Sequence, residues 1–248
     1  TALWRAYVNT QLAHNPEARA QFARGAEALG LLPALWRARI TRAEAQAAIA
    51  QGDLVAADTS IRQSLREQVS SEEQLLGRLV QARVIELQGE KDRALRIYTA
   101  VAKAPIDAIS APAQLRATQI RLEQGKITPL QAAGVFDGLR YRWRGDATEL
   151  ETIRALGQLY LGQGRYREAL EALRSAGKRL PDLAEAQQLQ ADLSTAFRGL
   201  FLDGLADGLE PVQALALFYD FKELAPIGAD GDLMVRKIVR RLVDVDLL

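Results

Sequence analysis

The stretch that decides the fold runs from Ile153 to Leu173 and reads IRALGQLY (153–160), LGQ (161–163) and GRYREALEAL (164–173). Apolar side chains recur every three to four residues on both sides of Gly164, which is the spacing of two amphipathic helices. A glycine after a helical pattern commonly marks the point where a helix stops and the chain reverses. The stretch therefore predicts two antiparallel helices joined by a tight turn at Gly164.

The order of residue types in this stretch resembles that of the tetratricopeptide-repeat (TPR) family, whose unit spans about 34 residues. The positions that carry the resemblance are Ile153, Leu156-Gly157, Tyr160, Gly164, Tyr166, Ala169, Leu173 and Pro181. The resemblance implies a right-handed α-solenoid of antiparallel helix pairs, each covered by its neighbours. It also implies that the first helices of the pairs line a concave groove that binds peptides or partner helices.

Glycines repeat along the chain at Gly52, Gly89, Gly125 and Gly164, with spacings of 37, 36 and 39 residues. Small and bulky residues at helix crossings follow three of these glycines, namely Ala57 and Ile61, Ala94 and Tyr98, and Ala169 and Leu173. The residues expected at the crossings before them are Ala45 and Ala48, Ala82 and Ile85, and Gly157 and Tyr160. After Gly125 the pattern carries an insertion, KITP (126–129).

The N-terminal segment fits the same pattern with substitutions. Trp4 takes the aromatic position, Asn15-Pro16 replaces the glycine, and Pro33 ends the unit. We expect Asn15 to adopt the left-handed conformation, which asparagine tolerates, and Ala20 to be the small residue at the crossing.

A second echo relates PLQAAGVF (129–136) to PVQALALF (211–218), each followed by a Gly-Asp turn, at 145–146 and 231–232. In this alignment Ile153, Leu156 and Leu159 correspond to Val239, Leu242 and Val245. The last 17 residues then form the first helix of a unit whose second helix is missing. One long helix is expected between residues 183 and 201, and turns at 203–204 and 207–208.

The sequence therefore predicts an all-α protein of about 13 helices. Residues 1–181 form TPR-like repeats, and residues 182–248 form divergent repeats that continue the same solenoid and end in an incomplete unit.

Composition narrows the class of protein. Of the 248 residues, 48% are apolar and 25% are charged, as in ordinary folded proteins. The net charge of +1 gives no overall field that would recruit nucleic acid or an acidic membrane. No apolar run approaches the roughly 18 residues of a membrane span. The absence of cysteine suits cytoplasm and periplasm alike, so the compartment stays open. The missing initiator Met suggests a chain cut from a longer protein, and the Ala- and Arg-rich usage suggests a bacterial source.

No motif points to catalysis, a cofactor or a metal. His14 is the single histidine and has no carboxylate or nucleophile near it in the sequence. The aspartates at 203, 207, 230 and 232 lack the pattern of a calcium loop. The paired carboxylates Glu149/Glu151 and Glu168/Glu171 are expected on exposed helix faces. We therefore expect a protein that is not an enzyme.

The TPR resemblance places the fifth and ninth residues of each first helix on the concave side. The candidate groove residues are Arg42, Gln46, Leu79, Arg83, Leu115, Arg116, Gln119, Arg154 and Gln158, with Arg240 and Asp244 at the same positions of the last helix. Arginine and glutamine could hold an extended acidic segment through carboxylate and backbone contacts. The alternative is that these residues are solvated polar side chains on a helix face.

The C-terminal helix is the second candidate surface. Its apolar residues Val235, Ile238, Val239, Leu242 and Val245 are expected to lack cover within the chain and to contact a partner or a second copy. Just before this helix, six bulky residues are expected mostly in the core: Phe197, Leu200, Phe201, Phe218, Tyr219 and Phe221.

The sequence favours a noncatalytic scaffold that binds a protein or peptide partner in the groove, at the C-terminal end face, or both. One alternative is an accessory or regulatory domain of a larger bacterial enzyme or envelope assembly. Another is a repeat that binds single-stranded nucleic acid, for which Tyr141-Arg-Trp143-Arg144 is the best stacking candidate. Against that alternative, we expect Tyr141 and Trp143 to pack between repeats.

Overall fold

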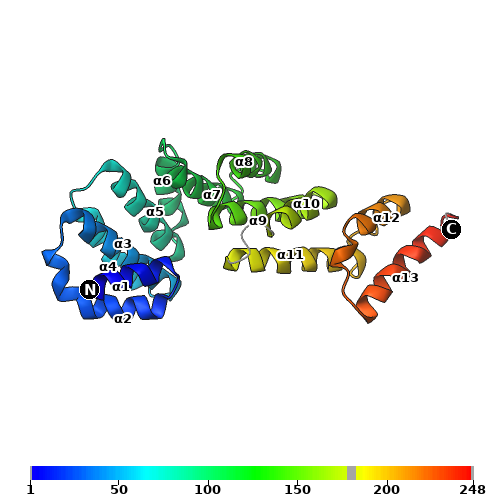
Figure 1. Cartoon of the computed structure of the whole chain (residues 1–248). Helices are drawn as coiled ribbons and strands as arrows, with labels where there is room; N and C mark the ends of the chain where they lie inside the picture. The colour runs from blue at the N-terminus through cyan, green and yellow to red at the C-terminus, as the bar shows by residue number, and fades with distance from the viewer. Residues whose placement is uncertain (1, 178–182, 247–248) are drawn as a thin grey trace. The chain divides into compact units, whose positions relative to one another are not determined.

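A computed structural model describes residues 2–177 and 183–246, and within these ranges the chain is all-α (Figure 1). The described residues form thirteen α-helices and no strand. The α-helices are α1 (Ala2–Gln11), α2 (Asn15–Gly25), α3 (Ala34–Ala50), α4 (Leu54–Arg66), α5 (Ser71–Leu87), α6 (Lys91–Val101), α7 (Asp107–Glu123), α8 (Pro129–Arg142), α9 (Ala147–Gly162), α10 (Tyr166–Gly177), α11 (Ala184–Phe201), α12 (Pro211–Asp220) and α13 (Ala229–Val243). Two short 3-10 helices, Ala26–Leu31 and Lys222–Leu224, complete the described structure.

Four glycines end first helices as the sequence predicts. Gly52, Gly89, Gly125 and Gly164 have φ angles of 74°, 90°, 66° and 72°, in the left-handed region that glycine adopts without a steric penalty. A buried alanine lies five residues after three of these glycines, at Ala57, Ala94 and Ala169. A bulky buried side chain lies nine residues after the same three, at Ile61, Tyr98 and Leu173. The predicted residues at the helix crossings are therefore confirmed in these repeats.

The N-terminal pair keeps the same offsets but begins two residues earlier than expected. Ala13, not Asn15, has the positive φ angle, 58°, and Asn15 is already the first residue of α2. Counting five and nine residues from Ala13 gives Ala18 and Phe22, both buried. The expectation that Ala20 lies at the crossing is wrong, because Ala20 is exposed.

The insertion after Gly125 shifts the pattern by two residues. Thr128 caps α8 and forms a capping box with Gln131, so the helix starts later than in the other repeats. The buried small and bulky residues are Ala132 and Phe136, seven and eleven residues after Gly125. The two added residues are thus absorbed entirely in the turn.

By its internal contacts the chain divides into two compact units, Thr1–Ile127 and Thr128–Leu248. In the first unit α1, α3, α5 and α7 pack in series, while α2, α4 and α6 each pack against the helix that precedes them. In the second unit α8 packs on α9, α9 on α10, and α11 on both α9 and α10. The expected boundary between residues 181 and 182, and the TPR-type Pro181, lie outside the described residues.

The core of the second unit contains most of the expected bulky cluster. Phe197, Phe201 and Phe218 stack with ring centroids 4.8 to 5.6 Å apart, and Phe221 is fully buried. The long helix expected between residues 183 and 201 is present as α11. Tyr219 departs from the expectation, because 65% of it is exposed.

The helix pair α12–α13 repeats the pair α8–α9, as the sequence predicts, but the alignment of α13 with α9 differs from the predicted one. Gly231-Asp232 lies inside the first turn of α13, and the turn before that helix is at Gly228, with φ 101°. A Cβ on Gly231 would lie 2.1 Å from the carbonyl oxygen of Pro226, so the chain before α13 folds back tightly on the helix. The correspondence of Ile153 with Val239 is therefore wrong.

Candidate interaction surfaces

The first helices of unit 1 lie side by side and supply a continuous surface. Helix α3 contacts both α1 and α5, and α5 contacts α7, an arrangement that Figure 1 shows for this unit. Because each second helix packs against its own first helix, the first helices keep one face for other contacts. Two carboxylates, Glu73 and Glu86, organise the polar side chains of this region.

Glu73, in the first turn of α5, is held by two arginines of α3. Its carboxylate accepts hydrogen bonds from Arg39 Nε and Arg42 Nη1, each at 2.6 Å. Only 7% of the Glu73 side chain is exposed. Burial acts to raise the pKa of Glu73, but the hydrogen bonds from Arg39 and Arg42 outweigh it, so its pKa lies below the ordinary value. Glu73 is therefore a fixed anion that locks α3 to α5.

Glu86, near the end of α5, plays the same part between α5, α6 and α7. It accepts a hydrogen bond from Tyr98 Oη at 2.8 Å and pairs with Arg83 at 3.1 Å. Arg116 binds it through both Nε and Nη2. Burial acts to raise the pKa of Glu86, and the bonds from Arg116 and Tyr98 reverse the shift, so the carboxylate stays ionised. Burial also raises the pKa of Tyr98, which keeps the phenol protonated as a donor.

The structure brings several predicted groove residues of unit 1 into these two clusters. Arg42 belongs to the Glu73 cluster, and Arg83 and Arg116 belong to the Glu86 cluster, where Gln119 accepts a hydrogen bond from Arg116 at 2.9 Å. Gln46 is exposed. Sequence reasoning missed Glu73 and Glu86, although Arg42 and Glu73, like Arg116 and Glu86, are separated by about one repeat, 31 and 30 residues.

Two predicted leucines of the groove lie deeper than expected. Leu79 is partly buried and packs against the core shared by α5, α6 and α7. Leu115 is only 1% exposed, so its assignment to an accessible groove is wrong. The helix that carries Leu115 turns this side chain into the core, which leaves Arg116 and Gln119 to supply its polar contacts.

An aromatic group adjoins the Glu73 cluster. The rings of Trp4 and Trp36 meet edge to face at 4.4 Å, and Tyr7 meets Trp36 at 6.1 Å. The Arg39 guanidinium lies over the Trp36 ring, 5.3 Å from its centroid. Trp4 is 38% exposed. Trp36 and Tyr7 carried no sequence prediction, although residues 4–36 hold four aromatics, Trp4, Tyr7, Phe22 and Trp36, in a chain with 6% aromatics.

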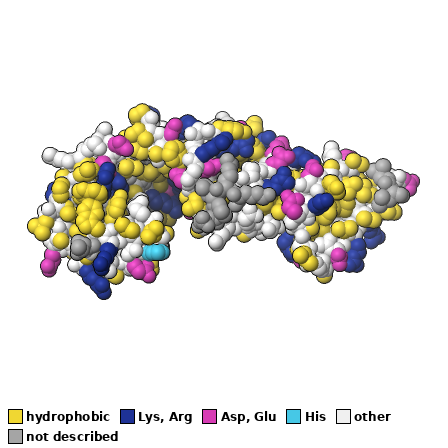
Figure 2. All heavy atoms as spheres, viewed as in Figure 1, with side chains coloured by type: hydrophobic (Ala, Val, Ile, Leu, Met, Phe, Trp, Pro, Cys, Tyr) yellow, Lys and Arg dark blue, Asp and Glu magenta, His cyan; other side chains and the backbone are white. Residues whose placement is uncertain are grey.

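A shallow hollow of about 290 Å³ lies beside this group and is lined by residues of α3, of α5 and of the segment between α4 and α5. Leu35 forms its apolar part, and Arg39, Glu72 and Glu73 form its charged part. Figure 2 shows apolar side chains gathered over the N-terminal helices together with separate basic groups. This surface therefore combines aromatic, apolar and guanidinium contacts.

In unit 2 the predicted Arg154 also pairs with a carboxylate. Its Nε lies 2.5 Å from Asp192 of α11, which accepts a further hydrogen bond from Gln188 at 2.9 Å. Gln158, one turn further along α9, is exposed. Four arginines of the predicted groove are therefore ion-paired within the chain, namely Arg42, Arg83, Arg116 and Arg154.

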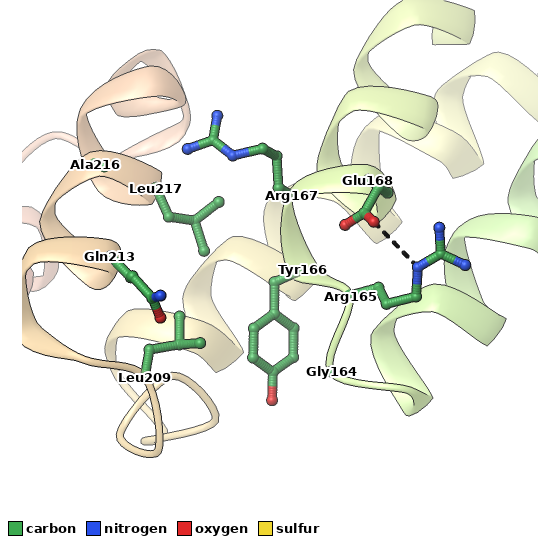
Figure 3. A pocket seen from close by; sticks show the side chains of 9 residues that line it. All are labelled: Gly164, Arg165, Tyr166, Arg167, Glu168, Leu209, Gln213, Ala216 and Leu217. Carbon is green, nitrogen blue, oxygen red and sulfur yellow. Dashed lines mark hydrogen bonds and ion pairs between the residues drawn. The ribbon is translucent and has the colours of Figure 1, made fainter.

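A second hollow, of about 320 Å³, lies between the start of α10 and α12 (Figure 3). The Tyr166 ring lies across from Leu209 and Gln213, and Leu217 closes the apolar side. Tyr166 Oη donates to the carbonyl of Leu205 at 2.9 Å, and Arg165 pairs with Glu168 at 3.1 Å. Three polar side chains of the rim, Arg165, Tyr166 and Glu168, are thus engaged within the chain, and the hollow offers mainly an apolar surface.

The C-terminal helix divides its predicted contact residues between two faces. Ile238 and Leu242 are 5% exposed and pack in the core, so their assignment to an open surface is wrong. Val235, Val239 and Val245 are 48%, 43% and 47% exposed. Val235 and Val239 therefore lie on an exposed face of the helix beside the buried one, and Val245 follows the end of the helix.

Several other predictions about single residues are settled by the structure. Glu149 is buried, and its carboxylate accepts a hydrogen bond from the Gly145 amide at 2.8 Å, so its expected exposure is wrong. Glu168 and Glu171 are exposed as expected, whereas Glu151 is partly buried, and His14 is exposed. Tyr141 does not pack between repeats, because 62% of it is exposed with Arg140 over its ring.

Within the described ranges no three acidic or histidine side chains gather as metal ligands, and no helix there is both long and apolar enough to cross a bilayer.

Comparison with known proteins identifies the fold. The sequence matches no protein-family model and no curated protein. Among solved structures, BtubC (BKLC) from P. vanneervenii aligns over 99% of this chain and 93% of its own, with a TM-score of 0.50 and 18% identity. A tetratricopeptide repeat protein from Parabacteroides merdae aligns over 85% of this chain and 88% of its own, with a TM-score of 0.44 and 14% identity.

At these identities the likeness concerns the fold alone. The alignment with BtubC agrees with the repeated helix pairs, the left-handed residue that ends their first helices, and the buried alanines that follow. The chain therefore has an all-α fold of repeated helix pairs, as the TPR-like pattern in the sequence predicts.

Proposed function

We propose that the protein is a noncatalytic scaffold that binds an acidic segment of a protein partner along the first helices of unit 1. The observation that carries this proposal is that two guanidiniums share each of two carboxylates, Arg39 and Arg42 at Glu73, and Arg83 and Arg116 at Glu86. Each guanidinium has five N–H donors. Two guanidiniums together therefore offer more donors than one carboxylate can accept.

These arginines are suited to recognition because their positions are already fixed. A side chain that is held before binding loses less conformational entropy when a ligand arrives. Arg83 combines this constraint with access, because 38% of its side chain is exposed, compared with 13% for Arg42. Arg83 is therefore the residue that we expect to contact a carboxylate of the partner directly.

The partner segment also needs apolar side chains. Trp4, Trp36 and Leu35 lie beside the Glu73 cluster and present partly exposed apolar surface. Aromatic and arginine side chains are the types that most often dominate the energy of protein interfaces. A segment that alternates acidic and bulky apolar residues would satisfy both parts of this surface.

The test is affinity capture of partners by the intact chain, compared with Arg83→Glu and with Arg62→Glu as the matched control. Arg62 lies on α4, pairs with Asp58 in the same helix and is 60% exposed. Partners should be retained by the Arg62→Glu protein and lost by the Arg83→Glu protein, and titration with the purified partner should show at least a tenfold loss, about 1.4 kcal/mol. If the Arg83→Glu and Arg62→Glu proteins bound the partner equally well, the partner would not bind along the first helices of unit 1.

A further inference from the structure

Helix α13 repeats α9 at a fixed offset of 82 residues. Asp146 precedes α9 and Gly228 precedes α13, and these two residues are 82 positions apart. The preceding helices begin at Pro129 and Pro211, again 82 residues apart. One position fixes the register at the other end: Gly164, with φ 72°, corresponds to Asp246, with φ 56°.

The left-handed conformation of Asp246 is informative because non-glycine residues rarely adopt it. In four repeats the residue with positive φ at this place is the one that turns the chain into the second helix of the pair. The backbone at the end of α13 therefore has the geometry that, elsewhere in this chain, directs a helix back along the first one.

In α9 the face that the second helix covers is known. Ile153 and Gly157 are buried there, and Ile153 shares a core with Leu170 and Leu173 of α10. A Cβ on Gly157 would lie 2.9 Å from Leu173, so the two helices touch at this point.

The corresponding face of α13 is open. Adding 82 to Ile153, Gly157 and Leu161 gives Val235, Val239 and Val243, which are 48%, 43% and 53% exposed. Adding 82 to Thr152, Leu156 and Tyr160 gives Met234, Ile238 and Leu242, which are 0%, 5% and 5% exposed. Helix α13 thus has the two apolar stripes of α9 and buries one of them.

We propose that the stripe of Val235, Val239 and Val243 binds one amphipathic protein helix, which lies on α13 as α10 lies on α9. A small side chain of that helix faces Val239, because valine fills the space that Gly157 leaves for Leu173. Acidic side chains border its apolar face, because Arg236 and Arg240 are exposed and follow two of the valines in the sequence.

An arginine at this place of a first helix pairs in α9 with a carboxylate of a later helix. The counterpart of Arg236 in α9 is Arg154, which binds Asp192 of α11, a helix that packs on both α9 and α10. This proposal deepens the assignment of the protein as a scaffold, and it concerns the second compact unit, whereas Glu73 and Glu86 belong to the first. The two proposals can therefore fail separately.

The experiment uses the chain up to Asp246, followed directly by a copy of the α10 sequence, residues 165–177. This copy carries the substitution L173A. Since Arg165 is the counterpart of position 247, this extension meets α13 in the register of the repeat. The matched control has the same extension with L170D in addition, because Leu170 is fully buried against α9 in its own pair. Amide hydrogen exchange measured by mass spectrometry reports the cover of α13 in both proteins.

We expect the amides of α13 to exchange at least about tenfold more slowly with the first extension than with the control. Equal exchange in the two extended proteins would overturn the proposal. Analytical ultracentrifugation of the unextended chain supplies the second readout. A dimer that dissociates on Val239→Asp but not on Val55→Asp, a change at a 79% exposed valine of α4, would also overturn it, since a second copy would then cover the stripe.

Discussion

Leu173 of α10 packs directly on Gly157 of α9, so closely that a Cβ at residue 157 would lie 2.9 Å from the leucine side chain. The glycine is required by this approach of two helices and not by backbone conformation, because residue 157 lies within α9. Gly77 of α5 meets Leu65 of α4 in the same way, with 2.7 Å between an added Cβ and the leucine side chain, so close glycine–leucine contacts occur at more than one helix crossing.

Gly157→Ala should lower the free energy of unfolding by about 1–3 kcal/mol, because the added methyl group overpacks the helix crossing. Chemical denaturation measures the change. Gly134→Ala is the control: this helical glycine has open space around its Cβ position, so the change should be neutral or stabilise by up to about 1 kcal/mol. A similar loss for both variants would contradict the role of Leu173.

Ala13→Gly should stabilise the protein, by about 1 kcal/mol at most. Ala13 has a φ of 58°, and an L-residue with a Cβ is strained there, whereas glycine is not. The reverse change at an equivalent turn, Gly89→Ala, should destabilise by about 1–2 kcal/mol, because Gly89 has a φ of 90° and its Cβ would meet no neighbouring atom. Thermal unfolding of the two variants checks both signs.

Glu86→Gln should reduce stability at neutral pH and flatten its dependence on pH in the acid range. The folded-state pKa of Glu86 lies below its ordinary value of 4.5, so the stability it contributes is present above that value. This contribution is lost as the pH falls through the lower, folded-state pKa. We expect a cost of about 1–2 kcal/mol at pH 7, measured by urea denaturation, and a smaller difference from the unchanged protein at acid pH.

Glu44→Gln should have the opposite effect and raise the stability of the protein at neutral pH. Burial raises the pKa of Glu44, and a hydrogen bond with Ser60 offsets the shift only in part, so the charged form is disfavoured in the folded protein. Because the folded-state pKa is raised, Glu44 lowers the free energy of unfolding at pH values above that pKa. The destabilisation disappears once the pH is below 4.5, where the group is protonated in both the folded and the unfolded state. The variant should therefore be more stable than the unchanged protein at pH 7 and equal to it at low pH. A loss of stability at pH 7 would show that the Ser60 contact outweighs the burial.

The repeat positions could be read from the sequence because local chemistry determines them. Gly52, Gly89 and Gly164 are needed wherever the chain takes the left-handed conformation at the end of a first helix, and the buried residues follow at fixed intervals. The same reasoning failed at Asn15, because the residue that takes the left-handed conformation is Ala13, an alanine that is disfavoured there and gives no turn signal in the sequence. There the buried Ala18 and Phe22 decide the register.

Whether an apolar or charged side chain faces solvent could not be read in this way. Leu115 and the neighbouring Arg116 are both compatible with a groove, and the packing of α7 against α5 and α6 decides that only the leucine enters the core. The ion pairs of Arg42 and Arg154 join residues 31 and 38 positions apart. No local pattern selects Glu73 or Asp192 as the partner, because many carboxylates lie at similar distances along the chain.

By itself the sequence determined the helical pairs, their turns and most of the small residues at their crossings, since each depends on backbone conformation and short-range periodicity. The tertiary structure alone decided which arginines share a carboxylate and which of the two apolar stripes on α13 is buried. The physical reason is that pairing and burial depend on how neighbouring helices are placed, and this placement is set by the sum of many contacts distant in sequence.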